Sequence, residues 1–355
     1  MTIQLVSEPL NPKPTVVYLG TPPTGVASLI AALESRFSLI HHAPKSLDAL
    51  LADLQDPSSP LSVASAVLRL GTAASTGVPL GWTRSVTALP HPPPALRLLI
   101  NLGHGLETED AAGAAASGIT VRGTAGGTDA TATVGLYLVV AAFRLLGAAE
   151  RAARSGDPAA FVGAMYRAAE ASIDPAGKTV GVIGYGRIGQ RTGELLRALG
   201  MRICCFRPGA RAGSVVEGGA AVYDDLDAMI SVVDCVLLAC PYTPETHHIL
   251  NWERIQKMKR GVRIVNIARG ACVDEDALIM GVEAGIIGGL GLDVYESEPK
   301  PNSKLLALDC ATLLPHVGGL SVSSVENHWR DAFQQTERFF YGNNDVIDRS
   351  RSTGE

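Results

Sequence analysis

Arg269, Glu298 and His316 each stand at or close to the carboxyl end of a continuous apolar run. An arginine can bind a carboxylate through two hydrogen bonds and polarise a neighbouring carbonyl, and a histidine can give a proton to a developing alkoxide. A glutamate bonded to that imidazole would raise its pKa and keep it protonated near neutral pH. Together these residue types suit the reduction of a 2-oxo acid, with Arg269 binding the substrate and His316 supplying the proton.

Each of the three residues also has an ordinary structural interpretation. An arginine after a strand is often a surface ion-pair partner, a lone histidine is more often structural, and Glu298 precedes Pro299 as a turn residue would. Their shared position is what favours chemistry, because ligands of open α/β sheets bind outside the carboxyl ends of the strands.

The apolar runs predict the elements that must position these side chains. Six runs after residue 128 alternate with helical stretches, and they are continuously apolar, as parallel strands buried on both faces are. This order predicts an α/β fold with a doubly wound sheet. The runs are Thr179–Gly184, Arg202–Arg207, Cys235–Cys240, Arg263–Ala268, Gly289–Val294 and Thr312–Val317.

A glycine-rich turn follows the first of these runs. Gly184, Gly186 and Gly189 have the spacing G-x-G-x-x-G, and a helix is predicted over Gln190–Leu199. The first glycine permits a tight turn, the second lets a pyrophosphate approach the backbone, and the third lets the helix pack on the sheet. The helix N-terminus adds amides and a positive dipole end. A chance turn is the alternative, but the strand before and the helix after favour dinucleotide binding.

The nucleotide that this turn would bind is indicated by the end of the second run. An NAD site has an acid there for the ribose 2′-hydroxyl, whereas this chain has Arg207, with Arg211 four residues later. An arginine can pair with a 2′-phosphate. The sequence therefore favours NADP(H), with NAD(H) possible if Arg207 is only a solvated strand-end residue.

The rest of the chain yields a coarser pattern. One long apolar helix is predicted over Thr128–Leu146, and the first 100 residues are loosely patterned. Before that helix we expect strands at Thr15–Leu19, Phe37–His41 and Ile119–Val121, an apolar run at Leu96–Asn101, helices near Val26–Ser35 and Glu109–Ser117, and loops at Asp56–Ser59, Gly71–Gly77 and Pro90–Pro94.

Composition excludes several classes of function. The net charge of −5 and the absence of a basic stripe argue against a nucleic-acid or membrane-surface partner. No secretory signal is read at Met1, and the longest apolar stretch, Val134–Leu146, contains Arg144 and is too short to span a bilayer. The six cysteines form no C-x-x-C pair, so we expect reduced thiols in a cytoplasmic protein and no metal site.

Several motifs occur in an order that resembles the D-isomer-specific 2-hydroxyacid dehydrogenases, from about Leu96 to Arg349. They are Gly-Tyr-Gly-Arg-Ile-Gly at 184–189, Cys-Pro-Tyr-Thr-Pro-Glu-Thr at 240–246, Asn-Ile-Ala-Arg-Gly at 266–270, Leu-Asp-Val-Tyr-Glu-Ser-Glu-Pro at 292–299 and Pro-His-Val-Gly-Gly at 315–319.

The resemblance implies roles for individual residues. Arg269, Glu298 and His316 would be the catalytic trio, and Asp293 would hold the nicotinamide carboxamide. The loop Gly103-His104-Gly105 would bind the substrate carboxylate through its backbone amides, together with Arg269. The residues expected along the cofactor are Gly184, Gly186, Arg187, Ile188, Gly189, Arg207, Arg211, Cys240, Pro241, Thr246, Ile267, Ala268, Asp293, His316 and Gly318.

The resemblance also implies two Rossmann-like, doubly wound domains. A discontinuous substrate domain would comprise residues 1–123 and 319–355, and an inserted dinucleotide-binding domain would comprise 124–318. A homodimer built on the Thr128–Leu146 helix and closure of a cleft between the domains are implied as well.

Several positions depart from the family pattern. Arg207 stands where NAD-using members have an acid, and His104 and Glu107 stand where members usually have a small or aliphatic residue and an Asp. His104 could reshape substrate choice or point to solvent. Gly123-Thr124-Ala125-Gly126 replaces the usual Asn-Thr-Pro-Gly, which puts that wall of the cleft in doubt.

Other activities on the same scaffold stay open. A corepressor-like protein that senses the dinucleotide would keep the trio, although such proteins have long disordered tails that this chain lacks. Phosphoglycerate dehydrogenase is a further alternative, and formate dehydrogenase is disfavoured because it would need a longer N-terminal region. The sequence does not name the side chain of the 2-oxo acid.

Overall fold

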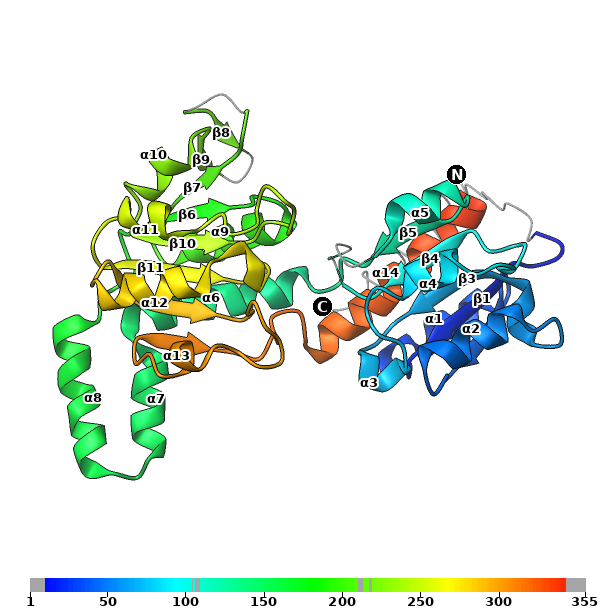
Figure 1. Ribbon diagram of the computed structural model, residues 1–355, viewed down its shortest axis with the longest axis horizontal. Helices are drawn as coiled ribbons and strands as arrows, with labels where there is room; N and C mark the ends of the chain where they lie inside the picture. The colour runs from blue at the N-terminus through cyan, green and yellow to red at the C-terminus, as the bar shows by residue number, and fades with distance from the viewer. Residues whose placement is uncertain (1–9, 104, 106–108, 210–212, 217–218, 343–355) are drawn as a thin grey trace, which may run out of the picture. The chain divides into compact units, whose positions relative to one another are not determined.

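The computed structural model describes residues 10–103, 105, 109–209, 213–216 and 219–342 (Figure 1). The chain divides into two compact units. The first unit comprises Met1–Gly127 and Ser321–Glu355, and the second comprises Thr128–Leu320. Assigning the first unit to the substrate and the second to a dinucleotide stays a prediction.

The second unit contains an eight-stranded sheet in the order β13-β12-β11-β10-β6-β7-β9-β8, parallel except for the β8–β9 pair. Counted from β6, strands β7 and β9 lie on one side and β10, β11 and β12 on the other, which is the strand order of dinucleotide-binding sheets. All six predicted runs are confirmed as strands, and the short β8 and β9 were not predicted. The strands are β6 (Thr179–Ile183), β7 (Arg202–Phe206), β8 (Val215–Val216), β9 (Ala220–Tyr223), β10 (Cys235–Leu238), β11 (Val262–Asn266), β12 (Ile287–Leu292) and β13 (Ala311–Leu313).

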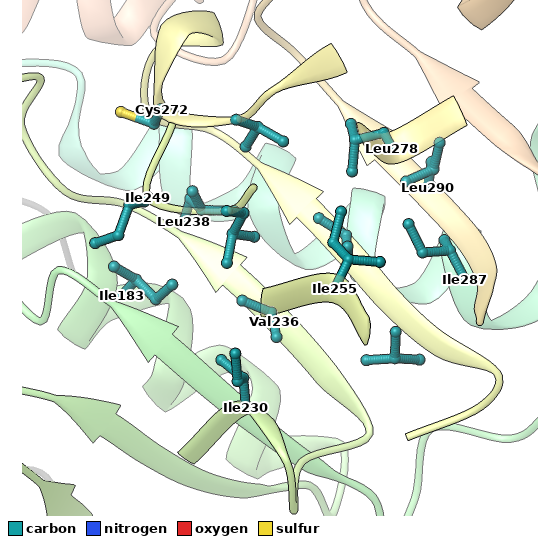
Figure 2. Close-up of a cluster of buried hydrophobic side chains, with 14 of the residues drawn as sticks. Ile183, Ile230, Val236, Leu238, Ile249, Ile255, Cys272, Leu278, Ile287 and Leu290 are labelled. Carbon is teal, nitrogen blue, oxygen red and sulfur yellow. The ribbon is translucent and has the colours of Figure 1, made fainter. Parts of the chain in front are cut away.

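Both faces of this sheet are buried, because successive side chains of each strand enter different cores. In β10, Val236 and Leu238 belong to one core, and Cys235 and Leu237 to the other. Figure 2 shows part of the first core, where side chains of β6, β10 and β12 meet those of the covering helices. Those helices are α10 (Leu226–Ile230), α11 (Trp252–Gln256) and α12 (Glu275–Glu283), while α6 (Thr128–Arg144) and α9 (Arg187–Ala198) cover the other face.

The α6 helix packs closely on β12, which has glycines where the two meet. A Cβ at Gly289 would lie 2.3 Å from the Ala142 carbonyl oxygen, and one at Gly291 would lie 2.9 Å from Leu138 Cβ. The predicted end of this helix at Leu146 is wrong. The helix ends at Arg144 because Leu145 takes a left-handed φ of 54°. The next helix, α7 (Leu146–Arg154), is bent by 80° from α6.

A second helix, α8 (Pro158–Ala171), lies beside α7 and forms a hairpin with it (Figure 1). None of the residues of α7 and α8 is buried. Within the part of the chain that the structure describes, no single helix is both long and apolar enough to cross a membrane; α6 and α7 reach that length only as a bent pair.

The first unit contains a five-stranded parallel sheet in the order β2-β1-β3-β4-β5. On one face, α1 (Ala27–Leu33) and α14 (Val322–Tyr341) bury Leu33, Trp329 and Phe333 against the strands. On the other face lie α2 (Leu47–Gln55), α4 (Trp82–Thr87) and α5 (Ala111–Ala116). The strands are β1 (Thr15–Leu19), β2 (Ser38–His42), β3 (Ala64–Arg69), β4 (Leu98–Asn101) and β5 (Thr120–Gly123).

Candidate active site

The three glycines of the turn after β6 each meet a different steric requirement. Gly184 has a φ of 92°, and a Cβ there would lie 2.4 Å from the Cα of Cys240 at the end of the adjacent strand. A Cβ at Gly186 would meet nothing within 4 Å, whereas one at Gly189 would lie 2.3 Å from the Gly184 carbonyl oxygen. Gly186 is also the N-cap of α9 and offers no side chain to the free amides of that helix. The open space and the uncapped amides suit a pyrophosphate.

The segment after β10 faces this turn across the switch point of the sheet. Cys240 is almost fully buried. The Thr246 hydroxyl accepts the Thr243 N–H at 2.7 Å and donates to the Pro241 carbonyl at 2.8 Å, so it closes its own loop. Cys240, Pro241 and Thr246 therefore belong to one closed loop after β10, next to the glycine turn. Their contact with a cofactor stays a prediction.

Arg207 directly follows β7, and its N–H donates to the Tyr223 carbonyl at 2.9 Å. Its side chain is exposed. Its charge acts on the neighbouring Cys205, whose pKa is raised by burial and lowered in part by Arg207 and Arg197. Arg207 therefore lies at the carboxyl end of β7, its contact with a 2′-phosphate stays a prediction, and Arg211 lies outside the described residues.

Arg269 ends a turn that the side chain of Asn266 organises. The Asn266 Oδ1 accepts the Ala268 N–H at 2.9 Å, and its Nδ2 donates to the Arg269 carbonyl at 2.9 Å. A Cβ at Gly270 would lie 1.8 Å from the Tyr295 carbonyl carbon, so this turn packs directly against the chain after β12. The motif Asn-Ile-Ala-Arg-Gly is explained by these contacts. The organising role of Asn266 was not predicted, although a buried amide at a strand end is a signal for it.

Asp293 holds the backbone that presents His316. Its carbonyl accepts the His316 N–H, and its carboxylate accepts the N–H groups of Val317 and Gly318, all at 2.8 Å. Asp293 is buried and His316 has a left-handed φ of 54°, so the loop conformation depends on these bonds. A contact of Asp293 with the nicotinamide carboxamide stays a prediction, alongside this structural role.

His316 and Glu298 form a hydrogen-bonded pair, with 2.7 Å between Nδ1 and Oε2. The other carboxylate oxygen of Glu298 accepts the Tyr295 N–H at 3.0 Å, which fixes its orientation. The bond to Glu298 raises the pKa of His316 against the opposing effect of burial. Burial raises the pKa of Glu298, but bonds from His316 and Tyr295 and the charges of His316 and Arg269 outweigh it, so that pKa is lowered. Since Nδ1 bonds Glu298, Nε2 is the nitrogen that can serve a substrate.

A second histidine–glutamate pair in the same unit was not predicted. His248 Nε2 bonds Glu296, and His248, like His316, has a positive φ, of 45°. The Glu296 N–H donates to Glu275 at 3.0 Å, and burial raises the pKa of that carboxyl. The His248 N–H donates to the Ala271 carbonyl at 2.9 Å. This pair joins the loop after β10 to the loop after β12. The Arg269 turn follows β11, the strand that lies between these two.

The predicted carboxylate loop lies in the first unit, after β4. Gly103 has a φ of 106°, and its N–H donates to Thr124 Oγ1 at 2.9 Å. His104 and Glu107 lie outside the described residues, and Gly105 is in irregular chain. Among the residues that are described, no three His, Cys, Asp or Glu side chains could together hold a metal ion.

The geometry can be compared with known proteins. The model of the D-isomer specific 2-hydroxyacid dehydrogenase NAD binding domain matches residues 136–318, which is more than half of the 355 residues. The chain is 37% identical over 243 residues to glyoxylate reductase of Thermococcus kodakarensis. The aligned region covers 66% of this chain and 70% of that protein.

Solved structures agree over nearly the whole chain. D-mandelate dehydrogenase of Rhodotorula graminis has a TM-score of 0.83 at 29% identity and covers 92% of this chain and 95% of its own. The NADPH-dependent glyoxylate/hydroxypyruvate reductase of Sinorhizobium meliloti, solved with NADP and malonate, has a TM-score of 0.69 at 26% identity and covers 93% and 95%. The chain therefore belongs to the D-isomer-specific 2-hydroxyacid dehydrogenase family, as its motifs indicated.

Proposed function

We propose that the protein reduces 2-oxo acids to D-2-hydroxy acids. The observation that supports this most directly is the 2.7 Å bond between His316 and Glu298, which lie with Arg269 on loops that follow neighbouring strands of one sheet. A reduced nicotinamide dinucleotide, with its pyrophosphate at the glycine turn, would supply a hydride to C2 of the substrate. Arg269 would bind the substrate and polarise its carbonyl, and His316 would give its Nε2 proton to the alkoxide oxygen. Glu298 would keep the imidazole protonated.

The assay that tests this proposal uses glyoxylate, hydroxypyruvate, phenylpyruvate and 2-oxoisocaproate, each with NADPH and with NADH. We expect turnover with at least one of them, and a D-configured product from each acid whose C2 becomes a stereocentre. The matched control is the same carbonyl compound without its carboxylate, which we expect to be a far poorer substrate. Absence of turnover with every 2-oxo acid and both nucleotides would contradict the proposal.

The proposed cofactor is NADP(H). Arg207 supports this assignment, because it is an exposed cation at the position where an NAD site has an acid. The Sinorhizobium meliloti relative is described as NADPH-dependent. All six cysteines are free thiols, which supports a reducing compartment such as the cytoplasm.

The proposed assembly is a homodimer that covers the α8 face. Four large apolar side chains are exposed on this helix, namely Phe161 (52%), Val162 (47%), Met165 (62%) and Tyr166 (68%). Their spacing puts them on one side of the helix, and contiguous exposed apolar patches of this kind mark protein interfaces.

We expect light scattering to give about twice the 37.1 kDa mass of the chain. The double variant Val162→Glu with Met165→Glu should then scatter as a monomer, because two charges would be buried without partners. Val215→Glu is the control, since Val215 is also an exposed valine of the second unit, on β8. A monomeric native protein, or a dimer that survives the double variant, argues against this interface.

A further inference from the structure

One face of α14 binds the segment Gly123–Gly126 through three side chains of the helix. His328, Asp331 and Gln335 share this face because they are separated by three and four residues. Asp331 Oδ2 accepts the Ala125 N–H at 2.7 Å, and the Gln335 side chain donates to the Gly123 carbonyl at 2.9 Å and to Asp331 at 3.0 Å. Where the family usually has a proline, Ala125 therefore supplies a backbone donor that a proline lacks.

His328 receives two bonds at one ring nitrogen. The Gly126 N–H lies 3.2 Å from Nδ1, and Thr124 Oγ1 lies 2.6 Å from the same atom. A backbone N–H can only donate, so Nδ1 accepts and bears no proton. Thr124 and His328 are both buried, with 1% and 3% of their surface exposed, so water cannot readily replace either bond if it is lost.

Thr124 also bonds Gly103, so it connects His328 to the end of β4. The Thr124 hydroxyl donates to His328 and accepts the Gly103 N–H at 2.9 Å, while the Thr124 N–H donates to the Gly103 carbonyl at 2.8 Å. Both backbone groups of Gly103 are thus bound to Thr124. The Gly103 amide already has a hydrogen-bond acceptor in Thr124, and the contact of this loop with a substrate carboxylate stays a prediction.

We propose that Thr124 and His328 are positioning residues for substrate binding, which rests on the proposed 2-oxo acid reductase function. Gly103 starts the predicted carboxylate loop with a φ of 106°, a conformation that non-glycine residues rarely adopt. We call the hydrogen bonds from Gly103 to Thr124 and from Thr124 to His328 the relay. The relay sets the direction in which the chain leaves β4. Neither side chain contacts substrate itself.

The test removes the relay without removing volume. In Thr124→Val the hydroxyl is lost at nearly constant shape, and in Thr124→Ser it is kept. In His328→Leu the acceptor is lost, and in His328→Asn the side-chain oxygen can replace Nδ1. We expect Thr124→Val and His328→Leu to raise KM for the 2-oxo acid about 10-fold or more, with less change in kcat and an unchanged Kd for NADPH. The Ser and Asn variants should stay within about 3-fold of the native KM.

A second readout does not depend on activity. Hydrogen exchange of the Gly103 amide should be slow in the native protein and in Thr124→Ser, and at least 10-fold faster in Thr124→Val. A fast Gly103 amide in the native protein overturns the relay, even if Thr124→Val fails to fold, and so does a folded Thr124→Val with native KM. If the native protein reduces no 2-oxo acid while this exchange pattern holds, the proposed function fails and the relay stands as a structural feature of the loop.

Discussion

Replacing His316 with alanine is expected to lower kcat for 2-oxo acid reduction by about 10²-fold or more while NADPH still binds. The reason is that His316 is the proposed proton donor, whereas the proposed site of the dinucleotide is the glycine turn and the N-terminus of α9. Steady-state kinetics gives kcat, and quenching or enhancement of NADPH fluorescence gives Kd.

The control for this variant is His248→Ala. His248 also has a positive φ and also bonds a glutamate of the loop after β12, but it has no proposed role in the reaction. We expect it to lower kcat far less than His316→Ala does. Equal losses in the two variants, or retained turnover in His316→Ala, would remove His316 as the acid.

The pH dependence of kcat tests the same role of His316. The proposed mechanism needs protonated His316, and the bond to Glu298 raises the pKa of that imidazole. The native kcat should therefore hold at low pH and fall as pH rises through this raised pKa. In Glu298→Gln the carboxylate charge is gone, so the pKa of His316 falls and the loss of activity should begin at lower pH. A profile that does not move would mean that Glu298 does not act on His316.

Replacing Arg207 with aspartate is expected to reverse the cofactor preference. In the native protein kcat/KM should be higher with NADPH, because a charge-assisted bond forms only with the 2′-phosphate. That bond should contribute about 10- to 100-fold to the ratio of kcat/KM for NADPH over NADH. In Arg207→Asp the new carboxylate repels the phosphate and can accept a bond from the 2′-hydroxyl of NADH.

The control for Arg207→Asp lies on the same strand. Arg202 is exposed at the amino end of β7 and donates to Thr179 Oγ1 at 3.1 Å. It lies about 16 Å along the strand from Arg207, beyond the roughly 10 Å over which surface charges act at 0.1 M salt. Arg202→Asp makes the same change in net charge and should leave the preference unaltered. Equal use of both nucleotides by the native protein would contradict the role of Arg207.

The sheet of the second unit could be predicted because its strands are buried on both faces and read as continuous apolar runs. In the first unit β3 was missed, since Ala64, Ser65 and Ala66 are too small to stand out as an apolar run although all are buried. The end of α6 was missed because a left-handed Leu145 has no signature in its side chain.

The position of Arg269, Glu298 and His316 after neighbouring strands could be predicted from the sequence, and so could the bond between His316 and Glu298. The other bonds that hold these residues could not. His328 contacts Thr124 across 204 positions of sequence, and Asp293 binds the backbone amides of Val317 and Gly318, which any residue except proline would offer. Contacts of this kind depend on the tertiary fold and leave no pattern in the sequence.

The place of α14 in the chain has a consequence for synthesis. Trp329 and Phe333 fill the core on one face of the first sheet, yet they are translated after the whole of the second unit. A nascent chain that has already made all five strands of the first sheet has only α1 to cover that apolar face, so the part that α14 buries is still exposed to water. The second unit, by contrast, is continuous, so all of its core residues are present once it has been translated. The first unit therefore completes its core after the second unit, although most of its residues come first in the chain.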